Sequence, residues 1–200
     1  MNLLLLEPAE VGADGVAVLS GARAGHVRHV LRAQPGQRIR VGIIDGERGT
    51  GTVLSLDEHG VTVRCQLDGM QPERPPVDLL LALPRPKVMR RLWAQLAALG
   101  VGRIILTNAE RVERNYFDTH VLETNVYRAL LVEGLQQARD TRLPIVSIHR
   151  RLKVLVEDDL DGLCPGGARL VAHPDSETTF AAALAGNTAV RGLASAARTE

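Results

Sequence analysis

The residues of this chain best suited to chemistry are clustered cations. Five arginines and no acid lie between Arg23 and Arg40, and seven lysines or arginines lie between Arg85 and Arg114 against two glutamates. Because the whole chain has a formal net charge of only +1, these clusters are local concentrations of charge. They favour a polyanion as ligand, and the residues alone leave solvated helix faces open as the alternative.

Other reactive side chains give weaker signals. His26 and His29 lie three residues apart, but no carboxylate or cysteine beside them completes a metal site, so polar or RNA contacts are the favoured interpretation. Cys65 and Cys164 are far apart and in no CxxC motif, which argues against a metal site or a disulfide. The sequence has no GxGxxG, P-loop or HExxH motif, and no residue is assigned as catalytic.

The second cationic cluster accompanies a predicted strand, loop and helix. An apolar run at 79–83 predicts a buried strand that two prolines end, and apolar residues at helical spacing from 88 to 99 predict a helix capped by Gly100. Arg85, Lys87 and Arg90 therefore follow the carboxyl end of a strand, where open α/β sheets bind ligands. A solvated turn is the alternative.

The periodicity of the whole chain predicts an α/β protein with an N-terminal β-barrel. Residues 1–70 are expected to form a small barrel with one helix at 20–33 and strands at 3–6, 16–19, 38–44, 50–56 and 61–67. A Pro-rich linker follows at 71–76. Residues 77–190 are expected to form a parallel sheet with helices near 88–100, 122–138, 151–163 and 179–184 and strands at 79–83, 103–107, 145–148, 168–172 and from 188. The tail at 191–200 has no apolar periodicity.

Composition favours a soluble protein in the cytoplasm. The chain is 45% hydrophobic and 24% charged, as in ordinary globular proteins. Its first ten residues show no basic leader, and their run of four leucines is too short for a signal peptide or a membrane span. No membrane contact is expected.

Six segments, in order along the chain, resemble motifs of the ribosomal RNA small subunit methyltransferase E family. The motifs are HxxxVLR…PG, the first strand and loop of the second domain, the ELGV helix end, SER, EQxxRxxxP and LHP. Ala98 and Gln136 stand where glutamate is usual in these motifs. The matching segments are 26–36, 81–87, 99–101, 110–111, 137–144 and 170–174.

The resemblance implies a PUA-like barrel that holds ribosomal RNA and a SPOUT α/β domain whose trefoil knot binds S-adenosylmethionine. Members of this family methylate N3 of a uridine in 16S rRNA. They are typically homodimers, and the reaction needs no metal. Here the resemblance assigns cofactor contacts to Leu83, Pro84, Ala172, His173 and Pro174. The candidate RNA contacts are Arg23, His26, Arg28, Arg32, Arg85, Lys87, Arg90, Arg111 and Arg114.

The C-terminal part departs from the family pattern. The family continues after LHP with a GPEGG loop and an LGxRxLRxET segment, whereas these 200 residues end in RGLASAARTE. Those segments supply most of the cofactor pocket, the knot crossing and much of the dimer interface. The chain is therefore expected to be a truncated member with impaired or absent activity and low stability. The alternatives are a non-catalytic RNA-binding protein and an unrelated nucleotide-binding α/β protein.

Overall fold

A computed structural model describes residues 3–74, 76–172 and 175–186. The chain divides into two compact units, Met1–Leu152 and Lys153–Glu200. The first unit holds two sheets, and the linker expected at 71–76 lies within it. No helix among the described residues has the length and apolar character needed to cross a membrane.

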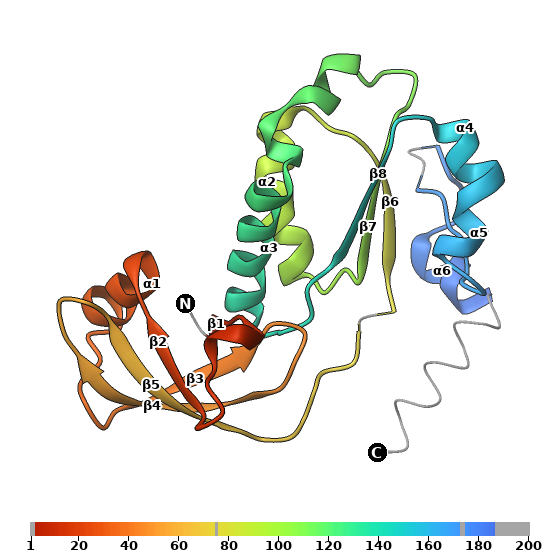
Figure 1. The fold of residues 1–200 in the computed structure, drawn as a ribbon. Coiled ribbons are helices and arrows are strands. Elements are labelled where there is room, and N and C mark those ends of the chain that lie inside the picture. Colours follow the sequence, from red (N-terminus) through yellow and green to blue (C-terminus); the bar gives the residue numbers. More distant parts are fainter. Residues whose placement is uncertain (1–2, 75, 173–174, 187–200) are drawn as a thin grey trace. The chain divides into compact units, whose positions relative to one another are not determined.

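The N-terminal part of the first unit is a curled sheet of five strands (Figure 1). The strands run in the order β1-β3-β4-β5-β2; β1 is parallel to β3 and the other pairs are antiparallel. Their bounds are β1 Leu4–Leu6, β2 Val16–Leu19, β3 Arg38–Ile43, β4 Arg48–Leu56 and β5 Val61–Leu67. Their apolar side chains fill one core, which confirms the small β domain that the alternating pattern predicts.

The helix expected at 20–33 is shorter than predicted. A single-turn 3₁₀ helix, η1 (Pro8–Glu10), precedes it, and the helix itself consists of α1 (Gly21–Gly25) and a π-helical turn, η2 (His26–Val30). Arg32 has a φ of 49°, in the left-handed region, and a right-handed helix cannot continue through that conformation. Apolar spacing alone did not reveal this stop.

A parallel sheet of three strands follows in the order β6-β7-β8. Figure 1 shows α2 (Pro86–Ala98) and α3 (Thr124–Ala138) side by side against this sheet. The strands are β6 Asp78–Ala82, β7 Arg103–Thr107 and β8 Ile145–His149, and two 3₁₀ helices lie between β7 and α3, η3 Arg114–Asp118 and η4 His120–Leu122. The predicted strand, loop, helix and strand from 79 to 107 are thereby confirmed. Gly100 adopts the left-handed φ of 79° expected of a helix cap.

The two sheets of the first unit share a hydrophobic core. Leu3, Leu5 and Ile44 of the N-terminal part belong to the same cluster as Met89 and Trp93 of α2. Polar contacts reinforce this junction: both guanidinium nitrogens of Arg128 contact the Glu7 carboxylate, at 2.5 and 2.9 Å. The hydrogen bonds from Arg128 to Glu7 raise the pKa of Arg128.

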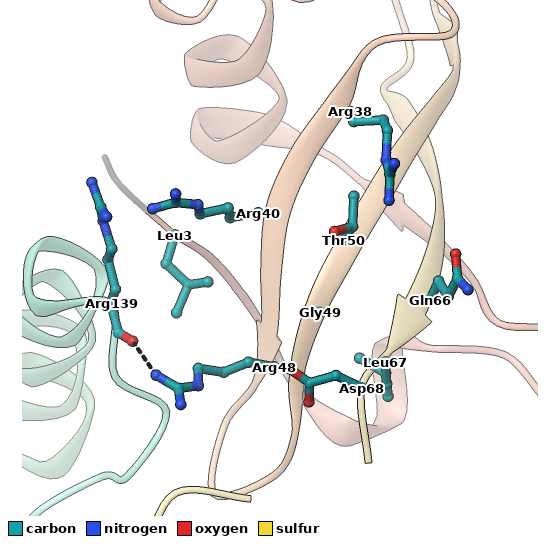
Figure 2. Close-up of a pocket in the computed structure, with 10 residues that line it drawn as sticks. All are labelled: Leu3, Arg38, Arg40, Arg48, Gly49, Thr50, Gln66, Leu67, Asp68 and Arg139. Atoms are coloured by element: carbon teal, nitrogen blue, oxygen red, sulfur yellow. Dashed lines mark hydrogen bonds between the residues drawn. The ribbon is translucent and has the colours of Figure 1, made fainter. Parts of the chain in front are cut away.

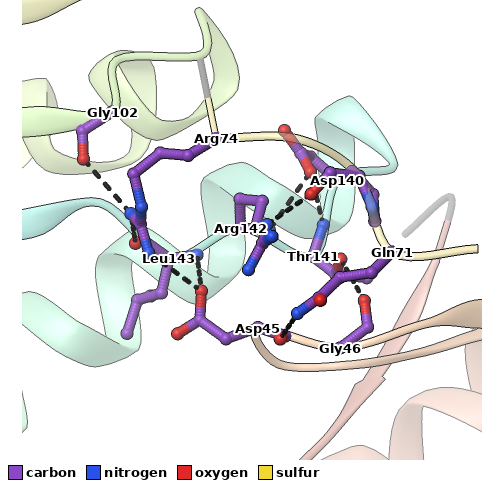
Figure 3. Close-up of polar contacts among 10 residues, drawn as sticks. Asp45, Gly46, Gln71, Arg74, Gly102, Asp140, Thr141, Arg142 and Leu143 are labelled. Carbon is purple, nitrogen blue, oxygen red and sulfur yellow. Dashed lines mark hydrogen bonds and ion pairs between the residues drawn. The ribbon is translucent and has the colours of Figure 1, made fainter. Parts of the chain in front are cut away.

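Backbone groups at 45–46 and 141–143 form a second polar junction (Figure 3). The Asp45 N–H donates to the Thr141 carbonyl at 2.8 Å, and the Thr141 hydroxyl donates to the Gly46 carbonyl at 2.8 Å. The Asp45 carboxylate accepts from the Leu143 N–H at 3.1 Å and from Arg74 at 3.4 Å. The β3–β4 turn is therefore tied to the segment that leads into β8.

The second unit is mainly helical in its described part. The helix expected at 151–163 is present as α4 (Leu152–Val154), η5 (Leu155–Asp159) and α5 (Leu160–Leu163), and α6 spans Phe180–Gly186. The strand predicted at 168–172 is wrong, since these residues have no regular structure and Val171 is 90% exposed. A strand needs a neighbouring strand for its backbone hydrogen bonds, and within the described residues this segment pairs with none. The strand expected from 188 and the tail lie outside the described residues.

Candidate functional site

Exposed cations follow the carboxyl ends of two adjacent strands of the parallel sheet. β6 and β7 end side by side, with Ala82 paired to Thr107, and the Leu83 N–H donates to the Thr107 carbonyl at 2.9 Å. The loop after β6 carries Arg85, and Lys87 lies in the first turn of α2; both side chains are exposed, as are those of Arg90, Arg111 and Arg114. The loop after β7 carries Arg111 and Arg114, and Arg90 follows in the first turns of α2. The structure therefore brings five of the nine predicted RNA contacts to one edge.

The start of α2 adds to the positive potential of this edge. Arg85 is the residue before the first helical turn, Pro86 begins the helix, and the first turn contains no acid. The unpaired N–H groups and the positive end of the helix dipole attract anions. The positive end of the helix dipole therefore adds to the positive charge of Arg85 and Lys87.

Three buried polar groups lie at or behind this edge: Thr107 ends β7, Asn108 follows it, and Ser147 lies in the middle of β8. Thr107 Oγ1, Asn108 Oδ1 and Ser147 Oγ are inaccessible to solvent and have no hydrogen-bond partner within the described part of the chain. Ser147 is paired with Ile105, so it shares the face of Ile105 and Thr107, opposite the one that packs on α2 and α3. Buried polar groups without a hydrogen-bond partner lower the stability of the fold. Here they indicate a surface that a ligand or another segment completes.

The end of β8 holds the cationic loop in place. Arg150 donates to the Asp118 carboxylate at 2.8 Å and to the Phe117 carbonyl at 3.3 Å, and its guanidinium carbon lies 5.4 Å from the centre of the Phe117 ring. Because these residues belong to η3, which follows Arg111, this contact positions the loop. Arg150 and the three buried polar groups were not predicted from the sequence. A polar residue inside an otherwise apolar strand, such as Ser147, was the available signal.

The predicted RNA contacts in the β domain are paired with acids, partly buried or close to carboxylates, so less of their positive charge is available to a ligand than at the sheet edge. Arg23 forms a bidentate ion pair with Glu10, and its hydrogen bonds hold the pKa of Glu10 below its usual value. His26 is half-buried, and its Nε2 is shielded from solvent. Arg28 and Arg32 line one hollow, but two carboxylates line it too, those of Asp57 and Glu58. Opposite charges offset these cations.

The residues assigned to S-adenosylmethionine do not fit that group by themselves. Leu83 is 3% exposed and belongs to the hydrophobic core, Pro84 is half-buried, and Ala172 is exposed in the second unit. His173 and Pro174 lie outside the described residues. S-adenosylmethionine carries a carboxylate, an ammonium group and an adenine, and the three described residues have no polar side chain to pair with them. Within the described residues, no group of three His, Cys, Asp or Glu side chains could hold a metal ion.

The fold and this edge define a class of protein, in which an N-terminal PUA-like domain is followed by an α/β domain with a cationic edge on its parallel sheet. A model of the RNA methyltransferase domain matches residues 72–195, and a model of the RNA methyltransferase PUA domain matches residues 19–65. The chain belongs to the ribosomal RNA small subunit methyltransferase E family. This excludes the unrelated nucleotide-binding protein considered above.

Individual relatives agree with this assignment. Ribosomal RNA small subunit methyltransferase E of Treponema pallidum is 31% identical over 156 residues, which are 76% of this chain and 58% of that protein. The Mycobacterium tuberculosis enzyme of the same name is 26% identical over 177 residues, covering 86% of this chain and 68% of its own. The chain therefore spans between about half and two thirds of these relatives' lengths.

Solved structures share the fold. A putative methyltransferase from Legionella pneumophila, in complex with the bound cofactor SAM, superposes with a TM-score of 0.66 at 18% identity, covering 90% of this chain and 73% of that one. Ribosomal RNA small subunit methyltransferase E from Neisseria gonorrhoeae, bound to S-adenosyl methionine, superposes with a TM-score of 0.55 at 21% identity. The match covers 74% of this chain and 61% of that one. At these identities the likeness supports the fold alone.

Proposed function

We propose that this chain binds 16S ribosomal RNA through the carboxyl edge of its parallel sheet, as part of an enzyme that N3-methylates a uridine with S-adenosylmethionine as donor. The observation that carries the proposal is that exposed cations follow two adjacent parallel strands, Arg85 and Lys87 after β6 and Arg111 and Arg114 after β7. The names of the relatives and the donor bound to two structural neighbours support it. We further propose a cytoplasmic homodimer divided into domains at 1–70 and 77–190.

Binding of RNA tests this proposal directly. We expect the double variant Lys87→Gln/Arg90→Gln to bind a fluorescent 16S rRNA fragment about tenfold more weakly at ~0.15 M salt, because two phosphate contacts are lost. Fluorescence anisotropy over a range of salt concentrations measures the affinity. The control is Lys153→Gln/Arg169→Gln, which removes the same charge from the second unit, where Lys153 is 81% exposed. Equal affinities of the two double variants would refute the proposed interface.

A non-catalytic RNA-binding protein is the second candidate function. It is favoured by the lack of polar side chains among the described residues assigned to the donor. The 200 residues also contain no GPEGG or LRxET segment, so we propose that on their own they transfer methyl groups poorly.

Titration of the 200-residue chain with S-adenosylmethionine separates the two candidates. We expect isothermal calorimetry to detect no binding in the micromolar range, because Leu83, Pro84 and Ala172, the described residues assigned to the donor, offer its polar groups no side-chain partner. Sinefungin, a donor analogue with the same amino-acid and adenosine groups, is the matched second ligand. Micromolar binding of either compound would contradict the incomplete pocket and favour the catalytic function.

A further inference from the structure

The N-terminal sheet carries a second concentration of arginines, on the face away from its core. A hollow of about 460 Å³ opens there, and Figure 2 shows the side chains that line it. Arg38, Arg40 and Arg48 come from β3 and β4, and Arg139 comes from the end of α3. We call this hollow the four-arginine cleft. Asp68 contributes its one acidic side chain.

Strand alternation fixes the side on which these arginines lie. Ile39 and Val41 pack into the core of the β domain, so Arg38 and Arg40 project from the opposite face. In the register of the sheet, Arg40 lies across from Thr50, which lies across from Gln66. The cleft therefore combines cations with hydroxyl and amide donors.

The cleft has a net positive charge, with four arginines against the one carboxylate of Asp68. Within the described part of the chain, the side chains of Arg38, Arg40 and Arg139 make no hydrogen bond or ion pair, and Arg48 donates only to the Arg139 carbonyl, at 3.5 Å. The Asp68 carboxylate accepts the N–H of Met70 at 3.0 Å. Like charges gathered without partners repel one another, and a polyanion relieves that repulsion.

Arg139 stands in an unusual backbone conformation for an arginine. It follows the last turn of α3 with a φ of 61° and donates its N–H to the Leu135 carbonyl. Glycine is the residue that ordinarily fills this left-handed position after a helix, because a Cβ is disfavoured there. An arginine here carries that backbone cost; its charge suits the negative end of the helix dipole, and its side chain also adds a cation to the cleft.

We propose that the four-arginine cleft binds the phosphates of the RNA backbone, at a site separate from the carboxyl edge of the parallel sheet. The inference deepens the proposed function and rests on its RNA substrate. Arg38 and Arg40 are two residues apart on a strand, or about 7 Å, so they face successive phosphates of a polymer rather than one small ion. All five aromatic residues of the chain lie at position 93 or beyond, so the cleft has no ring for base stacking. Contacts of its arginines with phosphates do not depend on RNA sequence.

The double variant Arg40→Gln/Arg139→Gly tests the cleft without disturbing the fold. Arg40 is exposed, and glycine suits the backbone of residue 139, so the melting temperature should not fall. Binding of two labelled single-stranded RNAs of unrelated sequence is measured by anisotropy against salt concentration. We expect affinity for both RNAs to fall about tenfold at ~0.15 M salt, and the slope of log K against log salt to become shallower by roughly 1.4.

The outcomes separate this inference from the proposed function. Lys153→Gln/Arg169→Gln, with the same loss of charge, should keep the affinity and slope of the unaltered chain. If the unaltered chain binds RNA and Arg40→Gln/Arg139→Gly binds it with the same affinity and slope, the cleft is not an RNA site, and the proposed function stands. A loss restricted to one RNA sequence would replace phosphate contact by base recognition and overturn the inference. If the unaltered chain binds neither these RNAs nor the 16S rRNA fragment, the proposed function fails and the inference fails with it.

Discussion

Replacing Gly134 with alanine should destabilise the protein by about 3 kcal/mol, the upper end of the usual cost of overpacking a core. Gly134 lies in α3 where that helix crosses α2. A Cβ at this position would lie 2.1 Å from the Ala94 carbonyl oxygen and 2.9 Å from its carbonyl carbon. The obstacle is backbone and cannot rotate away as a side chain does. The two helices must therefore separate, which loosens the core around Met89 and Trp93.

Urea unfolding followed by circular dichroism measures this loss. The matched control is Gly25→Ala in α1, because that glycine has a helical conformation and a Cβ added there would meet nothing within 4 Å. Alanine is the better helix former, so Gly25→Ala should be neutral or stabilising by up to about 1 kcal/mol. If both substitutions have the same small effect, α2 and α3 do not approach closely at Gly134.

Local pattern was enough to predict most elements of the first unit. The strands at Val16–Leu19, Val61–Leu67 and Arg103–Thr107 have the predicted bounds, because apolar runs or alternation end there at turn residues. The segment at 168–172 shows the limit of this reasoning. Its apolar residues resemble those of a buried strand, but whether a strand forms depends on an edge to pair with, and local sequence does not contain that information.

The candidate site was predictable where strand order decides it. Loops after neighbouring parallel strands must lie at one edge, so Lys87 and Arg111 could be placed together before any coordinates were known. Their contact with RNA stays a prediction. The four-arginine cleft was not predictable in the same way, since Arg48 and Arg139 are 91 residues apart and meet only because the two sheets share a core. Alternation along β3 is enough to place Arg38 and Arg40 on the same face of the sheet, but it gives no information about Arg139.

Trp93→Ala should cost about 3–5 kcal/mol, as expected for a large side chain removed from a core. The indole is fully buried in α2, and its ring centre lies 5.1 Å from that of Tyr127 in α3. Its Nε1–H donates to the Val121 carbonyl at 3.0 Å, and this hydrogen bond connects η4 to α2. Alanine removes both the packing and this hydrogen bond.

Trp93→Phe separates the two contributions. Phenylalanine keeps a ring against Tyr127 but leaves the buried Val121 carbonyl without its donor, so we expect a loss of about 1–3 kcal/mol. Leu99→Ala is the control on the same segment, because Leu99 is 80% exposed and its truncation should change stability by less than about 0.5 kcal/mol. Since Trp93 is the one tryptophan of the sequence, circular dichroism in urea must replace intrinsic fluorescence. A Trp93→Ala variant as stable as Leu99→Ala would place the indole outside the core, and η4 would then need another anchor.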